Sequence, residues 1–338
     1  MPSSTSSSSP RRWKGVWLVT LLVALGVCGG VEYHWRSLGY VAAVIDSKLL
    51  WSEQRERVYA RDSRTPLVIL GASRIEFSID MPLLQEALPK YTPVMLAING
   101  HYPLAALRDL AADGNFHGVI LCDIDSRGLT AAYRDMQQPY VDYFHQRWTP
   151  SWRLHRGALT WWQHTAVIAN PDFGVLPSAL RWLDGHPDPW KSYVRFRADR
   201  SGDADYSKVD IAPLTKIFAD NFQRRLQSDP APPAQRWLAQ LTDVQGWVGQ
   251  IQARGGEVIF YNTPTAGELR QHADAAYPKD QYWDRFASMI GAPTLDYTEV
   301  SALEAIPLPD GSHLDYRDKP AYTQALVDAL VQRGWLQR

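Results

Sequence analysis

Short runs of branched apolar residues, each ending at a glycine or a polar turn, constrain this fold most. The runs cover residues 65–70, 92–98, 118–124 and 257–261, with a shorter one at 293–297. Runs of this length are typical of strands buried on both faces, as in parallel sheets. Helical patterns separate most of them, so the sequence predicts an α/β fold with a central parallel sheet of about five strands and right-handed crossovers.

The helices expected between and after these strands cover residues 81–88, 103–112, 240–254, 280–290 and 319–333. Asp80 is a plausible N-cap for the first of them. Gly255 and Gly256 stop the helix that precedes residue 257. The alternation breaks between about residues 130 and 239, where Trp is frequent and only helical fragments are visible. We expect a helical insertion there, covering one side of the sheet.

Composition excludes several classes of protein. The formal net charge is -1, so no basic excess is present to neutralise phosphates, and nucleic acid is not an expected partner. Two Cys are too few for a disulfide scaffold or a thiolate zinc site. His145, His155 and His164 match no metal-ligand spacing. The sequence therefore predicts neither a cofactor nor a metal ion.

An uncharged apolar run over residues 15–31 follows a Ser-rich, basic N-terminus. With Trp13 and Tyr33 as interface residues, it predicts a transmembrane signal anchor over 13–33. Basic residues before the span predict a cytoplasmic N-terminus in the inner membrane and a periplasmic remainder. A cleaved secretory signal, or lipidation at Cys28, are the alternatives. We expect a disordered tail over 1–12 and a helical stalk over 34–64.

The first chemical motif follows the first predicted strand. Gly71-Ala72-Ser73 places a serine at the carboxyl end of a parallel strand, where sites of α/β proteins lie. Ile75 stands where a Gly-x-Ser-x-Gly elbow would have its second glycine. Taken alone, Ser73 has a simpler interpretation as a helix N-cap.

The second motif, Asp310-Gly311-Ser312-His313, lies between the last predicted strand and the last helix. Asp310 and His313 can face the same way on one turn. A carboxylate beside an imidazole fixes the tautomer and stabilises the imidazolium, which a serine nucleophile requires of its base. The alternative is a polar turn that caps the last helix.

Together these residues resemble the SGNH (GDSL-like) hydrolase superfamily. Ser73 matches the nucleophile of its first block, and Asp310 and His313 match its last block, Asp-x-x-His. Gly100, after the second strand, matches the glycine whose N–H serves the oxyanion hole. The resemblance covers about residues 65–125 and 257–338. It implies a flavodoxin-like, three-layer SGNH-hydrolase fold over 65–338 and a catalytic triad of Ser73, His313 and Asp310.

One departure concerns the third block, Gly-x-Asn-Asp, whose Asn donates to the oxyanion. This sequence has Ile124 in the place of that Asn, so the donor is missing or replaced. Asn99 is the candidate replacement, beside the N–H groups of Ser73 and Gly100. In lacking this Asn, the sequence resembles the divergent, membrane-anchored branch of the superfamily, which includes proteins of alginate acetylation and teichoic-acid D-alanylation.

Four polar residues near these motifs have two interpretations each. Arg74 either holds a carboxylate of an acidic polymer or pairs with a surface acid. Asp123 and Asp125 either form a glycosidase-like carboxylate pair or anchor a loop. His101 either lines the site or is a solvated loop residue.

The resemblance implies a membrane-anchored extracytoplasmic esterase or O-acyltransferase that acts on an acyl ester of an envelope polysaccharide or lipid, with a membrane acyltransferase as a possible partner. The alternative is a catalytically inactive SGNH-fold protein that binds polysaccharide or such a partner. A bitopic scaffold that only docks partners is a third class.

Overall fold

The computed structural model describes residues 10–59 and 63–338. The chain divides into two compact units. The anchor unit comprises Met1–Ile45 and Gly157–Ser192. The sheet unit comprises Asp46–Arg156 and Tyr193–Arg338.

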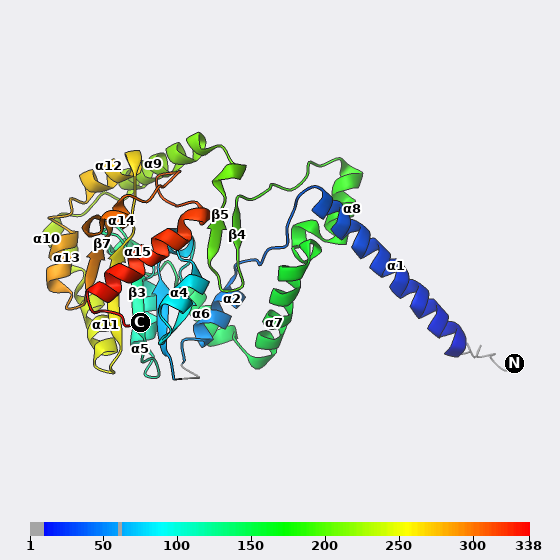
Figure 1. Cartoon of the computed structure of the whole chain (residues 1–338), viewed down its shortest axis with the longest axis horizontal. Helices are drawn as coiled ribbons and strands as arrows, with labels where there is room; N and C mark the ends of the chain where they lie inside the picture. Colours follow the sequence, from blue (N-terminus) through cyan, green and yellow to red (C-terminus); the bar gives the residue numbers. More distant parts are fainter. Residues whose placement is uncertain (1–9, 60–62) are drawn as a thin grey trace. The chain divides into compact units, whose positions relative to one another are not determined.

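A five-stranded parallel sheet forms the centre of the sheet unit (Figure 1). Its strands are β1 Thr65–Leu70, β2 Tyr91–Met95, β3 Val119–Asp123, β6 Glu257–Asn262 and β7 Thr294–Asp296. They lie in the order β2-β1-β3-β6-β7, and every neighbouring pair is parallel. This is the flavodoxin-like order, in which the direction of progress reverses at β1 and β3. The predicted fold class and all five strands are confirmed.

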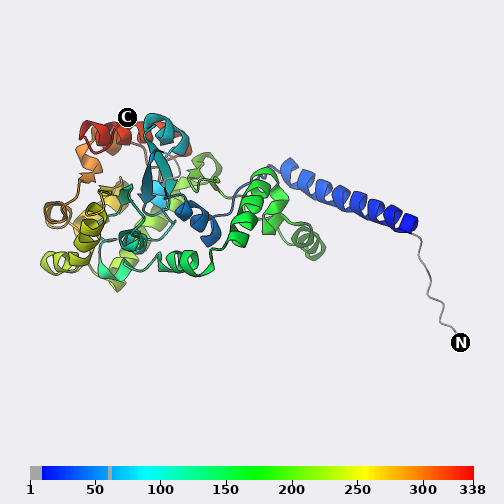
Figure 2. The same cartoon turned by 90° about the horizontal axis from the view of Figure 1, so that it is seen from below.

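Alternate residues of each strand point to opposite faces of the sheet, so the sheet has two cores. On one face, side chains such as Val68 and Ile120 pack with helices α5 Leu104–Ala112 and α11 Thr242–Gln252. On the other, side chains such as Ile69 and Leu121 pack with α4 Met81–Ala87 and α15 Lys319–Gln332. Figure 2 shows α15, in red, and α11, in yellow, on opposite sides of the sheet. The result is a three-layer α/β sandwich.

Further helices complete the sheet unit. They are α2 Lys48–Glu56, α3 Ser73–Glu76, α6 Gln138–Arg147, α9 Ile211–Ser228, α10 Ala234–Ala239, α12 Gly267–Ala276, α13 Trp283–Met289 and α14 Ser301–Glu304. Asp80 caps α4 as predicted, since its side chain accepts from the Leu83 N–H. Helices α9 and α12 pack side by side, along the top of Figure 1.

The stalk predicted over 34–64 is not one helix. The first helix, α1 Pro10–Ser37, is followed by Gly39, which has φ +85°. Helix α2 begins only after Ser47, whose side chain accepts from the Leu50 N–H. Helix α2 belongs to the core, because Trp51 is fully buried and donates from Nε1 to the carbonyl of Leu96 at 3.1 Å. The buried apolar residues of α2, Leu50 and Trp51, therefore pack within the sheet unit. Residues 60–62 of the predicted stalk lie outside the described residues.

The insertion predicted over 130–239 is not wholly helical, and it does not form one body. Residues Gly157–Ser192 belong to the anchor unit. An antiparallel pair, β4 Val194–Phe196 and β5 Gly202–Ala204, follows in the sheet unit. Helix α9 then lines a pocket at the carboxyl edge of the sheet, rather than covering one face.

The anchor unit contains α1, the end of α7 Pro150–Thr165, and α8 Val175–Asp184. Within α1, residues Trp13–Ser37 are long and apolar enough to cross a membrane, by length and composition. Protein buries very little of its most apolar stretch. The tail predicted over 1–12 lies outside the described residues as far as residue 9, and α1 already begins at Pro10.

Candidate active site

Ser73 lies at the sharp turn between β1 and α3. Gly71 precedes it with φ +154° and leaves no room for a side chain: a Cβ there would lie 2.5 Å from Cγ2 of Ile75 and 2.8 Å from Cβ of Asp123. The glycine therefore lets the chain turn tightly against β3. Ser73 begins α3 and is half-buried, with its side chain in the pocket at the carboxyl edge.

His313 joins Ser73 to Asp310. Nε2 of His313 lies 2.8 Å from Oγ of Ser73, and Nδ1 lies 2.9 Å from Oδ2 of Asp310. The two motifs, 240 residues apart, thus meet in one hydrogen-bonded chain. Its order of hydroxyl, imidazole and carboxylate is that of a serine-hydrolase triad.

Asp310 is fully buried and surrounded by donors. Its Oδ1 accepts from the N–H groups of Ser312 and His313 at 2.8 and 2.7 Å. Its Oδ2 accepts from the Tyr206 hydroxyl at 2.5 Å, besides facing His313. Burial acts to raise the pKa of Asp310, but the contacts with His313 and Tyr206 outweigh it and hold the pKa below its usual value. Asp310 is therefore ionised and fixed in orientation.

Aromatic rings enclose the imidazole of His313. The ring of Phe77, at the end of α3, has its centroid 5.6 Å away. The ring of Phe218, on α9, meets His313 edge-on with centroids 5.1 Å apart. His313 itself is buried. These contacts limit rotation of the ring, so the imidazole is held in one place.

The predicted oxyanion residues lie in the same pocket as Ser73. Asn99 and Gly100 both line it, and both are exposed. Gly100 has φ +74°, which suits a turn after β2. Within the described part of the chain, the N–H groups of Ser73 and Gly100 donate to no protein acceptor. Both donors are thus available to a bound oxygen.

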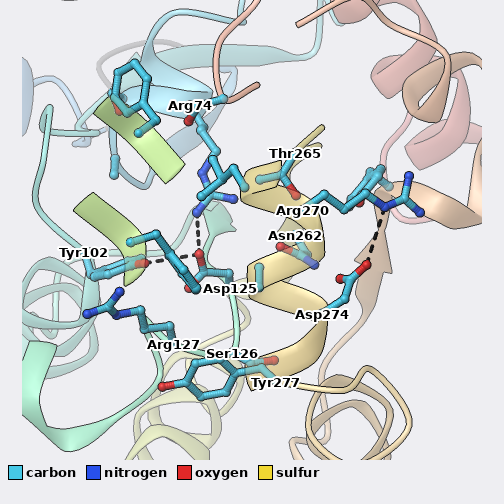
Figure 3. Close-up of a pocket in the computed structure, with 18 of the residues that line it drawn as sticks. Arg74, Tyr102, Asp125, Ser126, Arg127, Asn262, Thr265, Arg270, Asp274 and Tyr277 are labelled. Atoms are coloured by element: carbon cyan, nitrogen blue, oxygen red, sulfur yellow. Dashed lines mark hydrogen bonds and ion pairs between the residues drawn. The ribbon is translucent and has the colours of Figure 1, made fainter. Parts of the chain in front are cut away.

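The position of the missing Asn is buried away from the site. Ile124 packs in the core on the α5 and α11 side of the sheet. The next residue, Asp125, lines the pocket instead. It accepts from the Arg74 guanidinium and from the Tyr102 hydroxyl at 3.1 Å (Figure 3), and also from the Gly128 N–H at 2.8 Å. Arg74 thus pairs with an acid, as one interpretation expected, but this acid belongs to the pocket rather than to the surface.

Asp123 lies below this pair at the end of β3. Burial raises the pKa of Asp123 to about 6, against the lowering effect of Arg74 and of the Thr263 hydroxyl, which donates at 2.8 Å. Each carboxylate is thus held by its own protein partners, with Asp125 also anchoring the loop at Gly128. That arrangement favours the loop-anchoring interpretation over a glycosidase-like pair.

The pocket has a volume of about 510 Å³. Its walls come from the strand ends and from α9 and α12, with Phe222 and Leu269 among the apolar side chains. Four arginines line it: Arg74, Arg127, Arg225 and Arg270. Figure 3 shows Arg270 paired with Asp274 on α12. The site can therefore receive a substrate with both apolar and polar parts.

Sequence reasoning missed two residues of the insertion that support this site. Tyr206 holds Asp310, as described above. Arg200 is fully buried, with φ +69°, and donates from Nη1 to the carbonyls of Met95 and Ala97 at 3.2 and 2.8 Å. Its bidentate partner is Asp46, at 2.7 and 2.9 Å. Neither residue lies in a motif, so the sequence carried no signal for them.

Nδ1 of His101 donates to the Asn99 carbonyl at 2.8 Å, and the residue is half-buried beside the pocket turn. It is therefore neither a pocket-lining residue nor a fully solvated one. Over residues 10–59 and 63–338, no group of three or more His, Cys, Asp or Glu side chains is arranged to hold a metal ion.

No protein-family model and no curated protein matches the chain. Among solved structures, the chain is similar to a crystal structure of TesA. The two share 12% identity with a TM-score of 0.34, over 79% of this chain and 98% of that chain. At this distance the likeness carries no argument about the site, and the fold assignment rests on the strand order and layers described above.

Proposed function

We propose that this chain is a membrane-anchored, SGNH-type serine esterase or O-acyltransferase that acts on an acyl ester of an envelope glycan or lipid. The observation that carries the proposal is the continuous contact from Ser73 through His313 to Asp310, at an open pocket on the carboxyl edge of the sheet. An N-cap role for Ser73 gives no reason for its hydroxyl to face an imidazole that is itself held by a buried carboxylate.

In the proposed reaction, Ser73 Oγ attacks the ester carbonyl while its proton passes to Nε2 of His313. The N–H groups of Ser73 and Gly100, with the Asn99 side chain, stabilise the oxyanion. Collapse of the intermediate breaks the bond to the alcohol oxygen, which takes the proton from His313. Water or a sugar hydroxyl then attacks the acyl-enzyme, giving its proton to His313, and Ser73 recovers its proton as the acyl product leaves.

The proposal is tested with the full chain in detergent micelles, a fluorophosphonate probe and p-nitrophenyl acetate. Wild type is compared with Ser73→Ala, His313→Ala and a matched control, Ser126→Ala, which removes another serine hydroxyl from the same pocket. We expect probe labelling and ester cleavage in wild type and the control, and loss of both in the other two variants. Labelling that survives in folded Ser73→Ala would refute the assignment.

A second candidate function is binding without catalysis. The observation that favours it is Ile124, because a missing oxyanion donor typically costs about 2.7–4 kcal/mol of transition-state stabilisation. Absence of labelling and cleavage in a folded wild type, together with retention on an envelope polysaccharide column, is the result this candidate predicts.

The proposed location is the inner membrane, with α1 as a single span and the main domain on the periplasmic side. Support comes from Arg11, Arg12 and Lys14 before the apolar run. Alkaline phosphatase fused after Arg338 should be active in cells. Green fluorescent protein fused at the same position should be dark, because it would be exported. The opposite pattern would reverse the orientation.

A further inference from the structure

Helix α8 of the anchor unit presents a stripe of largely exposed apolar side chains. Leu176, Leu180 and Leu183 are 68%, 50% and 82% exposed. Their spacing of four and three residues puts them on one face of the helix. Three leucines on one face of a short surface helix are more than scattered exposure explains, and they indicate an apolar environment outside the protein.

The opposite side of α8 is fixed to the end of α1. Ser178 is fully buried and accepts from Nε1 of Trp35 at 2.9 Å. Trp182 stacks on Trp35 with ring centroids 6.1 Å apart, and meets His34 edge-on at 5.0 Å. Figure 1 shows α8 beside the C-terminal end of α1. The leucine stripe is therefore tied to one level along α1.

A second attachment fixes the same level. Both oxygens of Glu32 accept backbone N–H groups, from Val167 at 3.0 Å and Ile168 at 2.9 Å. Arg36 also donates from Nη2 to the neighbouring Thr165 carbonyl at 2.7 Å. These contacts keep the end of α1 ordered. All of them lie just beyond Val31, where the charge-free apolar run ends.

If α1 spans a bilayer, this level matches the height of the membrane surface. At about 1.5 Å per helical residue, Trp35 lies about 6 Å beyond Val31 along α1. The headgroup region on each side of the hydrocarbon core is about 5–8 Å thick, so the attachment falls within it. Interfacial helices place their apolar face at this boundary.

Exposed tryptophans accompany the stripe. Trp161, near the end of α7, and Trp190, after α8, are both largely exposed within the anchor unit. Trp is enriched at membrane interfaces because its ring is apolar and its N–H is polar. The stripe is fixed to the end of the helix that would cross the bilayer. The bilayer is therefore the apolar medium next to it, and we prefer it to a soluble partner as the occupant.

We propose that α8 is an interfacial helix. Its stripe of Leu176, Leu180 and Leu183 lies at the headgroup–acyl boundary of the bilayer that α1 crosses, and Trp161 and Trp190 lie in the headgroup layer. The occupant of this surface is the lipid bilayer. The inference is independent of catalysis at Ser73, but it uses α1 as a spanning helix.

The test places a polarity-sensitive probe on single cysteines of the full chain in phosphatidylcholine–phosphatidylglycerol vesicles. Cys28 is replaced by Ser, while Cys122 is buried and stays. Probes at Leu176→Cys and Leu183→Cys are compared with Asp184→Cys, an exposed acidic neighbour beyond the edge of the stripe. Leu21→Cys reports on the span itself.

We expect the leucine-stripe probes to be quenched at least about threefold more by shallow spin-labelled lipid than the Asp184 probe, and to resist iodide. If iodide quenches the probes on the stripe while the Leu21 probe lies in lipid, the interfacial position of α8 is overturned and the membrane span of α1 stands. Protection from both quenchers means that a second copy covers the stripe, and also overturns it. A Leu21 probe outside the lipid overturns both this inference and the anchor.

Discussion

The two units of this chain treat leucine in opposite ways. Leu121, in the centre of the sheet, is 1% exposed and packs between two layers of the sheet unit. Leu180, on α8 of the anchor unit, is half exposed and belongs to none of the buried apolar clusters of the described residues. The same side chain is thus enclosed by protein in one unit and largely unenclosed in the other, which is the difference expected if α8 lies at the proposed membrane interface.

The polar contacts of the two units also serve different purposes. In the sheet unit, Asp310 and Arg200 are fully buried, and each has several partners. In the anchor unit, the contacts of Ser178 and Glu32 join the last turns of α1 to the segment around α8. Buried charge in the sheet unit orients a candidate catalytic group, whereas polar contacts in the anchor unit fix a level along a helix.

The largest expected effect concerns the buried acid of the sheet unit. Asp310→Asn should lower kcat/KM for ester cleavage by about 10³–10⁴-fold, because the neutral amide no longer holds the His313 tautomer that accepts the serine proton. Asp318→Asn, a half-buried neighbour with no side-chain cap contact, is the control. Activity within a factor of a few of wild type would show that the buried contact is structural only.

The leucine contrast gives the next effect. Leu121→Ala should lower the free energy of unfolding of the sheet unit by about 2–5 kcal/mol, since it leaves a cavity between layers. Leu180→Ala should change the free energy of unfolding of its own unit, the anchor unit, by less than about 0.5 kcal/mol. Denaturant unfolding of the full chain in detergent measures both. Equal costs for the two substitutions would contradict the contrast between the units.

A pH effect tests the buried carboxyl below the pocket. Because burial raises the pKa of Asp123 from its ordinary value of 3.8 to about 6, the folded protein binds more protons than the unfolded chain between those pH values. Its contribution to stability is present below about pH 4 and is lost as the pH rises through 6, by up to about 3 kcal/mol. Asp123→Asn should remove that slope and be relatively more stable at pH 8. An unchanged slope would mean that Asp123 is ionised in the fold.

The smallest effect concerns Tyr206, a positioning residue. Burial and Asp310 raise the pKa of Tyr206 above its usual range, so its hydroxyl remains a donor. Tyr206→Phe should lower kcat/KM by about 3–30-fold, and it should move the acid limb of the pH profile upward as the pKa of Asp310 rises. Tyr193→Phe, whose ring lies 5.5 Å from that of Tyr206, is the control. A rate loss with an unmoved pH profile would indicate a purely structural role.

The local pattern of the sequence was sufficient for the sheet. The runs at 65–70 and 257–261 became β1 and β6 with almost the same bounds, because buried parallel strands require continuous apolar residues. The prediction of a helical stalk over 34–64 was wrong for a local reason too. Gly39 and the N-cap residue Ser47 interrupt the helix, and the spacing of apolar residues alone does not take account of either.

The site was only partly predictable. Ser73, Asp310 and His313 stand in short motifs, and the structure brings them into contact, while their catalytic roles stay predictions. The Arg74–Asp125 pair and the burial of Ile124 could not be read from spacing. They depend on which way each side chain leaves the end of β3, and packing against α5 and α11 decides that.

The sequence by itself determined the elements whose cause is local: an apolar anchor helix, buried parallel strands, and polar turns at their carboxyl ends. Tertiary structure alone decided that Tyr206 reaches Asp310 across 104 residues, that Arg200 supports the end of β2, and that α8 turns its leucines outward. The physical reason is that burial and hydrogen bonding belong to pairs of groups. A pattern along the chain records which groups are present, but only the fold records which of them meet.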